Sequence, residues 1–102
     1  MATASILPSG VVLAFAGASA PNGFLFCNGA SLSRTDYAQL FSAIGTAHGS
    51  IDAVSFNLPD YRGRFLRGLD GGISRDPDRA TRTAMNTGGN TGDALGTVQT
   101  AQ

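Results

Sequence analysis

Three arginines crowd into one short stretch of the chain, where their guanidinium groups could bind an anion or pair with a carboxylate. Arg62, Arg64 and Arg67 lie within six positions of one another, and Asp60 comes just before them. Arginine binds phosphate and carboxylate oxygens through paired hydrogen bonds, so this spacing first indicates an anion site. All seven positive charges of the chain are arginines, however, and seven aspartates match them. We therefore interpret the cluster as a set of structural ion pairs.

A carboxylate in this stretch could also serve in acid–base catalysis. A neighbouring guanidinium lowers the pKa of an aspartate and makes it a poor proton donor. Asp60 has arginines two and four positions away, so the structural interpretation is the better one. The stretch predicts no catalytic residue, and we expect the protein not to be an enzyme.

The single cysteine and the single histidine are the remaining candidates for chemistry. Cys27 follows Phe26 in an apolar run, which favours a buried and unreactive thiol. One cysteine allows neither an internal disulfide nor a cysteine-based zinc site. His48 lies in a loop rich in glycine and serine, where we expect it to be exposed to solvent, and a metal role would need ligands from other chains. The sequence thus predicts no metal site and no cofactor.

Charge and hydropathy exclude two further classes of partner. The net charge is zero, so no basic field would attract nucleic acid or an anionic membrane. The apolar run at 11–16 has no basic residue before it and is too short to span a bilayer. We expect no nucleic-acid binding, no membrane insertion and no signal peptide.

Short apolar runs bounded by glycine predict the strands that would position these residues. Residues 10–17 have the length of a buried strand, and residues 24–27 predict a second one after a turn, as in a hairpin. Pro59 begins the arginine-rich stretch with a turn, and residues 64–67 suit a short strand. Abundant glycine and few helical patterns favour a turn-rich α+β fold.

One amphipathic helix is predicted over about 33–45. Ser33 is a plausible N-cap, Asp36 places an acid in the first turn, and Gly45 ends the helix. Four apolar residues then recur at i, i+3, i+4 and i+7 and form one stripe. They are Tyr37, Leu40, Phe41 and Ile44. We interpret the stripe as core packing and not as a cofactor or partner groove.

The last third of the chain has a different composition. Residues 71–102 are rich in Gly, Thr and Asn and carry few large apolar residues, which cannot offset an ordering cost of roughly 1–2 kcal/mol per residue. We expect this extended segment to be flexible or to be ordered by something outside the chain. Residues 75–79 alternate Arg and Asp around Pro77, which predicts an exposed ion-paired turn, and residues 95–99 are the last place for a strand. Residues 1–9 are predicted to be an N-terminal arm and residues 10–70 a compact domain.

Three separated motifs in a fixed order resemble one known family. They are the run 23–29, the helix 33–45 and the stretch 56–68. Together they resemble the phage tail collar domain, and the likeness covers most of residues 10–70. The residues that carry this signature are Asn28, Gly29, Leu58, Pro59, Asp60, Arg62, Gly63, Arg64, Phe65, Arg67 and Gly68.

The resemblance implies a structural role in a tail fibre of a phage or a phage-like contractile injection system. It implies a homotrimer that joins other tail fibre or baseplate proteins and supports attachment to the host cell surface. Such a protein is made in the bacterial cytoplasm and works in the virion tail or an extracellular particle. Several relatives bind a metal through a later His-x-His segment, which this sequence lacks. The alternative is a stand-alone glycan-binding module that uses polar loops such as 46–55 or 87–93.

Overall fold

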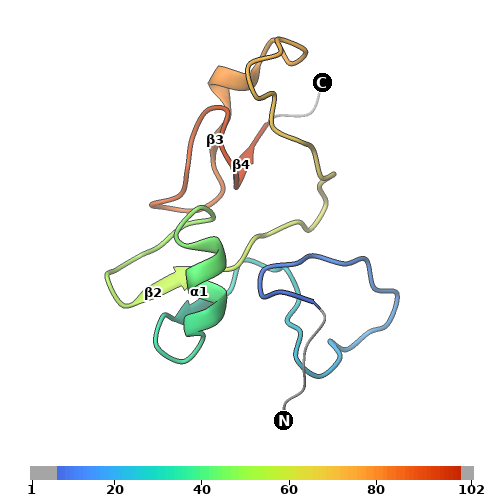
Figure 1. Ribbon diagram of the computed structural model, residues 1–102, viewed down its shortest axis with the longest axis vertical. Coiled ribbons are helices and arrows are strands. Elements are labelled where there is room, and N and C mark those ends of the chain that lie inside the picture. Colours follow the sequence, from blue (N-terminus) through green and yellow to red (C-terminus); the bar gives the residue numbers. More distant parts are fainter. Residues whose placement is uncertain (1–6, 100–102) are drawn as a thin grey trace.

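A computed structural model describes residues 7–99 and contains short elements joined by long irregular segments (Figure 1). In chain order they are β1 (Ser31–Ser33), α1 (Ala38–Ile44), β2 (Ser55–Asn57), the 3-10 helix η1 (Arg79–Thr81), β3 (Thr83–Ala84) and β4 (Thr97–Val98). Strand β1 pairs antiparallel with β2, and β3 pairs antiparallel with β4. One helix with short strands confirms the predicted α+β class. Most of the predicted arm at 1–9 lies outside the described residues.

The helix has the predicted position and end but begins later than predicted. Ser33 Oγ accepts hydrogen bonds from the backbone N–H groups of Thr35 and Asp36, both at 3.2 Å. Ser33 itself belongs to β1, where it faces Ser55, so residues 34–37 form a turn before α1 starts at Ala38. Pairing with β2 therefore holds the chain extended where the sequence pattern predicted helix.

The strands predicted at 10–17, 24–27 and 64–67 are absent, and these residues are irregular. Leu13 is 55% exposed and Phe15 is 56% exposed. The run at 24–27 leads into a single bridge between Asn28 and Asp60. Apolar residues in a short run indicate burial but supply no strand partner, and the described part of the chain offers none to these runs.

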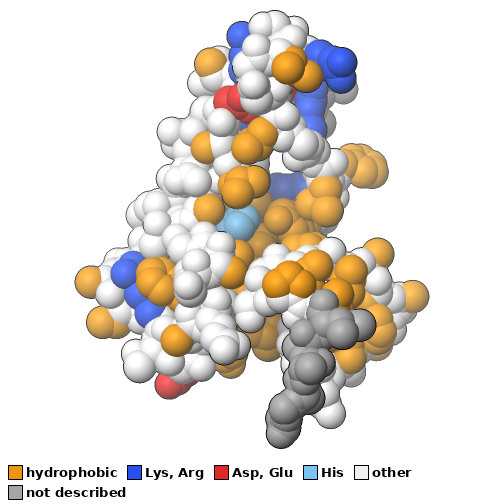
Figure 2. Space-filling view, viewed as in Figure 1, with side chains coloured by type: hydrophobic (Ala, Val, Ile, Leu, Met, Phe, Trp, Pro, Cys, Tyr) orange, Lys and Arg blue, Asp and Glu red, His pale blue; other side chains and the backbone are white. Residues whose placement is uncertain are grey.

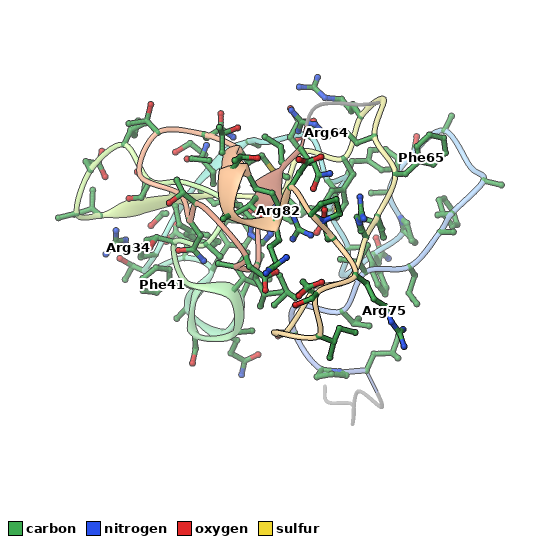
Figure 3. All side chains as sticks on the ribbon, turned by 90° about the horizontal axis from the view of Figure 1, so that it is seen from above. Arg34, Phe41, Arg64, Phe65, Arg75 and Arg82 are labelled. Atoms are coloured by element: carbon green, nitrogen blue, oxygen red, sulfur yellow. The ribbon has the colours of Figure 1, made fainter. Side chains whose placement is uncertain are left out.

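The core centres on β2. Phe56 is fully buried and Leu58 nearly so, and they are the buried large hydrophobic side chains among residues 7–99. The ring of Phe41 on α1 contacts Phe56 with centroids 5.3 Å apart, and the guanidinium of Arg34 lies 4.7 Å from the Phe41 centroid (Figure 3). Arg34 also donates through Nε to the carbonyl of Ser55 at 2.8 Å. The helix thus packs on β2 through one aromatic pair with an arginine beside it.

The C-terminal segment is folded within the single chain. It contains η1 and the β3–β4 pair and forms the upper part of the molecule in Figure 1. Strand β4 lies within residues 95–99, the range that the sequence marks as the last place for a strand. The whole molecule is elongated, with extents of 46 × 33 × 24 Å and a radius of gyration of 14.6 Å, against about 13 Å for a compact domain of this length.

Candidate functional site

The first half of the signature stretch is held by backbone hydrogen bonds to residues 27–30. The N–H of Leu58 donates to the carbonyl of Ala30 at 2.8 Å, and the N–H of Tyr61 donates to the carbonyl of Cys27 at 3.1 Å. The N–H of Gly29 donates in return to the carbonyl of Pro59 at 3.0 Å. These bonds extend the β1–β2 pairing, so the predicted turn at Pro59 is instead an extended segment beside its partner.

Asp60 and Arg62 form the expected ion pair. Arg62 Nε lies 2.8 Å from Asp60 Oδ1, and Arg62 Nη2 lies 2.9 Å from Asp60 Oδ2. The hydrogen bonds from Arg62 lower the pKa of Asp60 from 3.8 to about 2. Gly29 lies against this carboxylate with φ +78°, and a Cβ there would come within 3.2 Å of Asp60 Cβ. The pair therefore fixes a turn and leaves no proton to donate near neutral pH.

The second half of the signature leaves the body of the domain. Gly63 has φ +69°, and the N–H of Arg64 donates to the carbonyl of Tyr61 at 3.1 Å, which closes the turn. Arg64 Nη1 donates to the carbonyl of Asp60 at 2.6 Å. Phe65, labelled in Figure 3, is 99% exposed. The structure thus divides the signature residues into an anchored part, 57–61, and an exposed part, 62–69, which includes Arg67 and Gly68.

The helical stripe is only half buried in the single chain. Leu40, Phe41 and Ile44 are half-buried, and Tyr37 is 40% exposed. Tyr37, Leu40 and Ile44 line an open groove of about 1030 Å³, whose other side includes residues 7–12. Phe41 alone of the four turns toward Phe56 in an aromatic contact.

A second cluster of Arg and Asp lies in the C-terminal segment and is centred on three buried side chains. The turn predicted at 75–79 is exposed at Arg75 and Pro77, but its Asp76 is buried. Asp70 and Asp76 are 5% and 3% exposed, and Arg82 is 7% exposed. The Arg82 guanidinium pairs with Asp76 and donates through Nε to Gln99 Oε1 at 3.0 Å. Asp93 accepts the backbone N–H groups of Asp70 and Gly71 at 2.8 and 3.0 Å.

Asp70 organises the loop that follows it. Its carboxylate accepts the backbone N–H groups of Ser74, Arg75 and Asp76 at 2.8–2.9 Å. These hydrogen bonds lower the pKa of Asp70, and the hydrogen bond from Arg82 lowers that of Asp76. Sequence reasoning missed this burial because the partners lie up to 23 positions apart.

His48 is 8% exposed, so the expectation of a solvent-exposed histidine is wrong. Its ring meets Tyr61 edge-on with centroids 6.5 Å apart. Burial lowers the pKa of His48, and its Nδ1 has no hydrogen-bond partner in the structure. The histidine is buried because its loop is covered by the C-terminal segment, which local composition does not reveal.

We call this contact between residues 46–50 and residues 86–96 the clasp. The N–H of Ser50 donates to the carbonyl of Thr87 at 2.7 Å, and the N–H of Asn90 donates to the carbonyl of Ala47 at 3.1 Å. Gly96 has φ +81°, and a Cβ there would collide with the Ala47 carbonyl and lie 3.1 Å from His48 Cδ2. The backbone at Gly96 lies directly against the backbone at Ala47, and this close approach is possible because glycine has no Cβ.

Hydrophobic side chains remain exposed over the N-terminal third. Figure 2 shows them gathered over the lower part of the molecule, where Figure 1 draws residues 10–27. A second groove of about 410 Å³ is lined by residues 11–15 and 24–27 with Ala20, Pro21 and Tyr61. The thiol of Cys27 is half-buried at this groove, and burial raises its pKa.

The described residues contain neither a cluster of metal-ligating side chains nor a membrane-spanning helix. Between residues 7 and 99, no three His, Cys, Asp or Glu side chains come together as a metal site would require. Within the same range, no helix has the length and hydropathy to cross a bilayer.

Comparison with known proteins identifies the same family as the sequence motifs. The family model for the Phage Tail Collar Domain matches residues 10–66. Protein RhiB of Rhizobium leguminosarum bv. viciae is 38% identical over 80 residues, which cover 76% of this chain and 36% of RhiB. The uncharacterized protein StfE of Escherichia coli (strain K12) is 40% identical over 76 residues, which cover 74% of this chain and 38% of StfE. The chain spans just over a third of the length of these relatives, and no solved structure gives a significant match.

Proposed function

Because this chain belongs to the phage tail collar domain family, we propose that it is a structural module of a tail fibre that works as a homotrimer. In this proposal residues 10–70 form the collar and residues 71–102 lead from it along the fibre. The module joins other fibre or baseplate proteins and supports attachment to the host cell surface. Its place of action is the virion tail or a related extracellular particle.

The shortage of buried core in a single chain carries the proposal. Among residues 7–99, Phe56 and Leu58 are the buried large hydrophobic side chains, while sixteen others are exposed. The accessible surface is 7027 Å², whereas a compact monomer of 10.4 kDa has about 5,400 Å². Apolar surface of this extent is a mark of association, since burying it stabilises by about 25 cal/mol per Å². Copies of the same chain are the partners that the family membership favours.

Light scattering coupled to size exclusion tests the proposal. We expect a particle near three times the 10.4 kDa mass of one chain. A monodisperse species of one chain across the accessible concentration range, with a cooperative melt, would overturn it.

Glycan binding through the loops 46–55 and 87–93 has less support. The backbone groups of Ser50, Thr87 and Asn90 already bond within the clasp. A glycan array probed with the oligomer distinguishes the two functions, because the structural module predicts no glycan signal that depends on these loops.

A further inference from the structure

Phe65 and Leu66 form an exposed apolar tip that is held in place. Their side chains are 99% and 66% exposed. On one side Arg64 donates to the Asp60 carbonyl at 2.6 Å, and on the other Arg67 lies 3.7 Å from the buried Asp76 carboxylate. The two arginines thus tie both ends of the tip, which presents a large aromatic side chain to solvent. Because the backbone of the tip is already restrained, little further conformational entropy is lost when this side chain enters a binding site.

The groove at residues 11–15 and 24–27 is the complementary feature. Its volume is about 410 Å³, and its lining is apolar apart from the backbone, the Cys27 thiol and the Tyr61 hydroxyl. Residues 11–13 and 24–26 on its walls are themselves exposed, so its interior is open to an apolar side chain from outside. A phenylalanine buries roughly 150–250 Å² when it enters such a site.

One chain carries both the tip and the groove, but its tip does not fill its own groove. Tyr61 lines the groove, whereas Phe65, four positions later, is almost wholly exposed. Two different patches of one molecule that fit each other make a head-to-tail contact, and repeated contacts of this kind close into a ring when the rotation allows. The accessible surface of 7027 Å² exceeds that of a compact monomer by about 1,600 Å², which is comparable with two contacts at roughly 800 Å² each.

We propose that the Phe65–Leu66 tip of each subunit inserts into the 11–15/24–27 groove of the next copy. This inference rests on the proposed oligomer and names the two surfaces that build it. Each subunit gives its tip to one neighbour and receives the tip of the other.

Site-directed crosslinking tests the contact, because Cys27 lines the groove and is the only cysteine of the chain. Leu66→Cys keeps Phe65 and places a second thiol on the tip. A short bis-maleimide at mildly alkaline pH, which favours the Cys27 thiolate, should give covalent species of two and three chains on a denaturing gel. The control Ile51→Cys puts a thiol at a site that is 68% exposed and outside the groove, and it should stay uncrosslinked. The crosslink of Leu66→Cys should also vanish when Cys27→Ser is added.

A second variant measures the contribution of the tip. Phe65→Ser should weaken association by about tenfold or more, as for an interface hot spot, while Ile51→Ser should leave it unchanged. Both side chains are exposed in one chain, so neither change should alter the fold of the subunit.

The outcomes of these experiments distinguish a failure of the proposed contact from a failure of the proposed oligomer. An oligomer that shows no Leu66–Cys27 crosslink and tolerates Phe65→Ser overturns this contact and leaves the proposed function standing. A crosslink confined within single chains overturns it as well, because the tip then folds onto its own groove. A monomeric wild-type chain would overturn the proposed function and this contact together.

Discussion

At the scale of single residues, the acid–base properties follow from which groups are paired. Asp60 has both carboxylate oxygens bonded to Arg62, and its pKa falls to about 2. His48 is the opposite case, since it is buried without a partner for Nδ1 and its pKa is lowered by burial. The two groups therefore affect the stability of the fold in different pH ranges.

Asp60 should support the fold at all but strongly acidic pH. Its pKa is lower in the folded than in the unfolded chain, so its contribution is present above about pH 4 and is lost as the pH falls toward 2. Acid titration followed by circular dichroism should show that Asp60→Asn lowers stability at pH 7 and flattens the loss between pH 4 and 2. An unchanged acid limb would contradict the assignment.

His48 should make the protein less stable below about pH 6.5. The unfolded chain takes up a proton near that pH, while the folded chain resists protonation until lower pH, so stability rises with pH through this window. Tyr61, whose ring meets that of His48, has a raised pKa and stays neutral there. Melting temperatures at pH 5 and 7.5 should differ for the wild type and differ less for His48→Gln. Equal pH dependence in both proteins would show that His48 is not the titrating group.

At the scale of elements, β2 and α1 share a small aromatic core. Phe56 is fully buried, whereas Phe41 is half-buried and contacts it at 5.3 Å. Phe56→Ala should lower the free energy of unfolding by about 3–5 kcal/mol. Phe41→Ala should cost less, because part of its ring is already in water. Urea melts of both variants check the order, and the reverse order would place the core on the helix.

The clasp depends on glycine at one crossing. Gly96 and Gly92 both have positive φ, but a Cβ at Gly96 meets the Ala47 carbonyl, whereas a Cβ at Gly92 meets nothing within 4 Å. Gly96→Ala should therefore open the clasp, and Gly92→Ala serves as the control for backbone strain alone. Hydrogen exchange at the Asn90 amide, which donates to Ala47, reports the opening. Equal protection in both variants would mean that the close approach is not needed.

Sequence reasoning predicted the elements whose signals are local. Gly45 ends the helix, with its N–H donated to the carbonyl of Phe41, and the Asp60–Arg62 pair forms over two positions. Sequence reasoning failed where the residue that pairs with or covers a segment is distant in the sequence or lies outside the chain. Apolar runs such as 10–17 predicted strands that have no pairing partner among the described residues, and His48 is buried by residues some 40 positions away.

At the scale of the whole molecule, the signature stretch joins the collar to the C-terminal segment and should matter for assembly. Arg64 holds the chain at Asp60 just before the exposed tip. Arg64→Ala should lower stability or assembly and leave any ligand binding by folded material intact, as measured by thermal melts with light scattering. If binding to a ligand were lost at an unchanged melting temperature, the structural role of the signature would be wrong.

The clasp also has a mechanical consequence. A pull on the C-terminal segment is transmitted through the covalent segment 62–69, through the hydrogen bonds of Ser50 and Asn90 across the clasp, and through the hydrogen bond from the Asp60 N–H to Met85 Sδ. The covalent segment is exposed and irregular, so it can extend once the contacts of Arg64 with Asp60 and of Arg67 with Asp76 open, and the clasp bonds then carry the force. Their rupture releases length while the two halves stay joined. A fibre built from this chain would therefore yield under tension at these contacts before the β1–β2 pair is pulled apart.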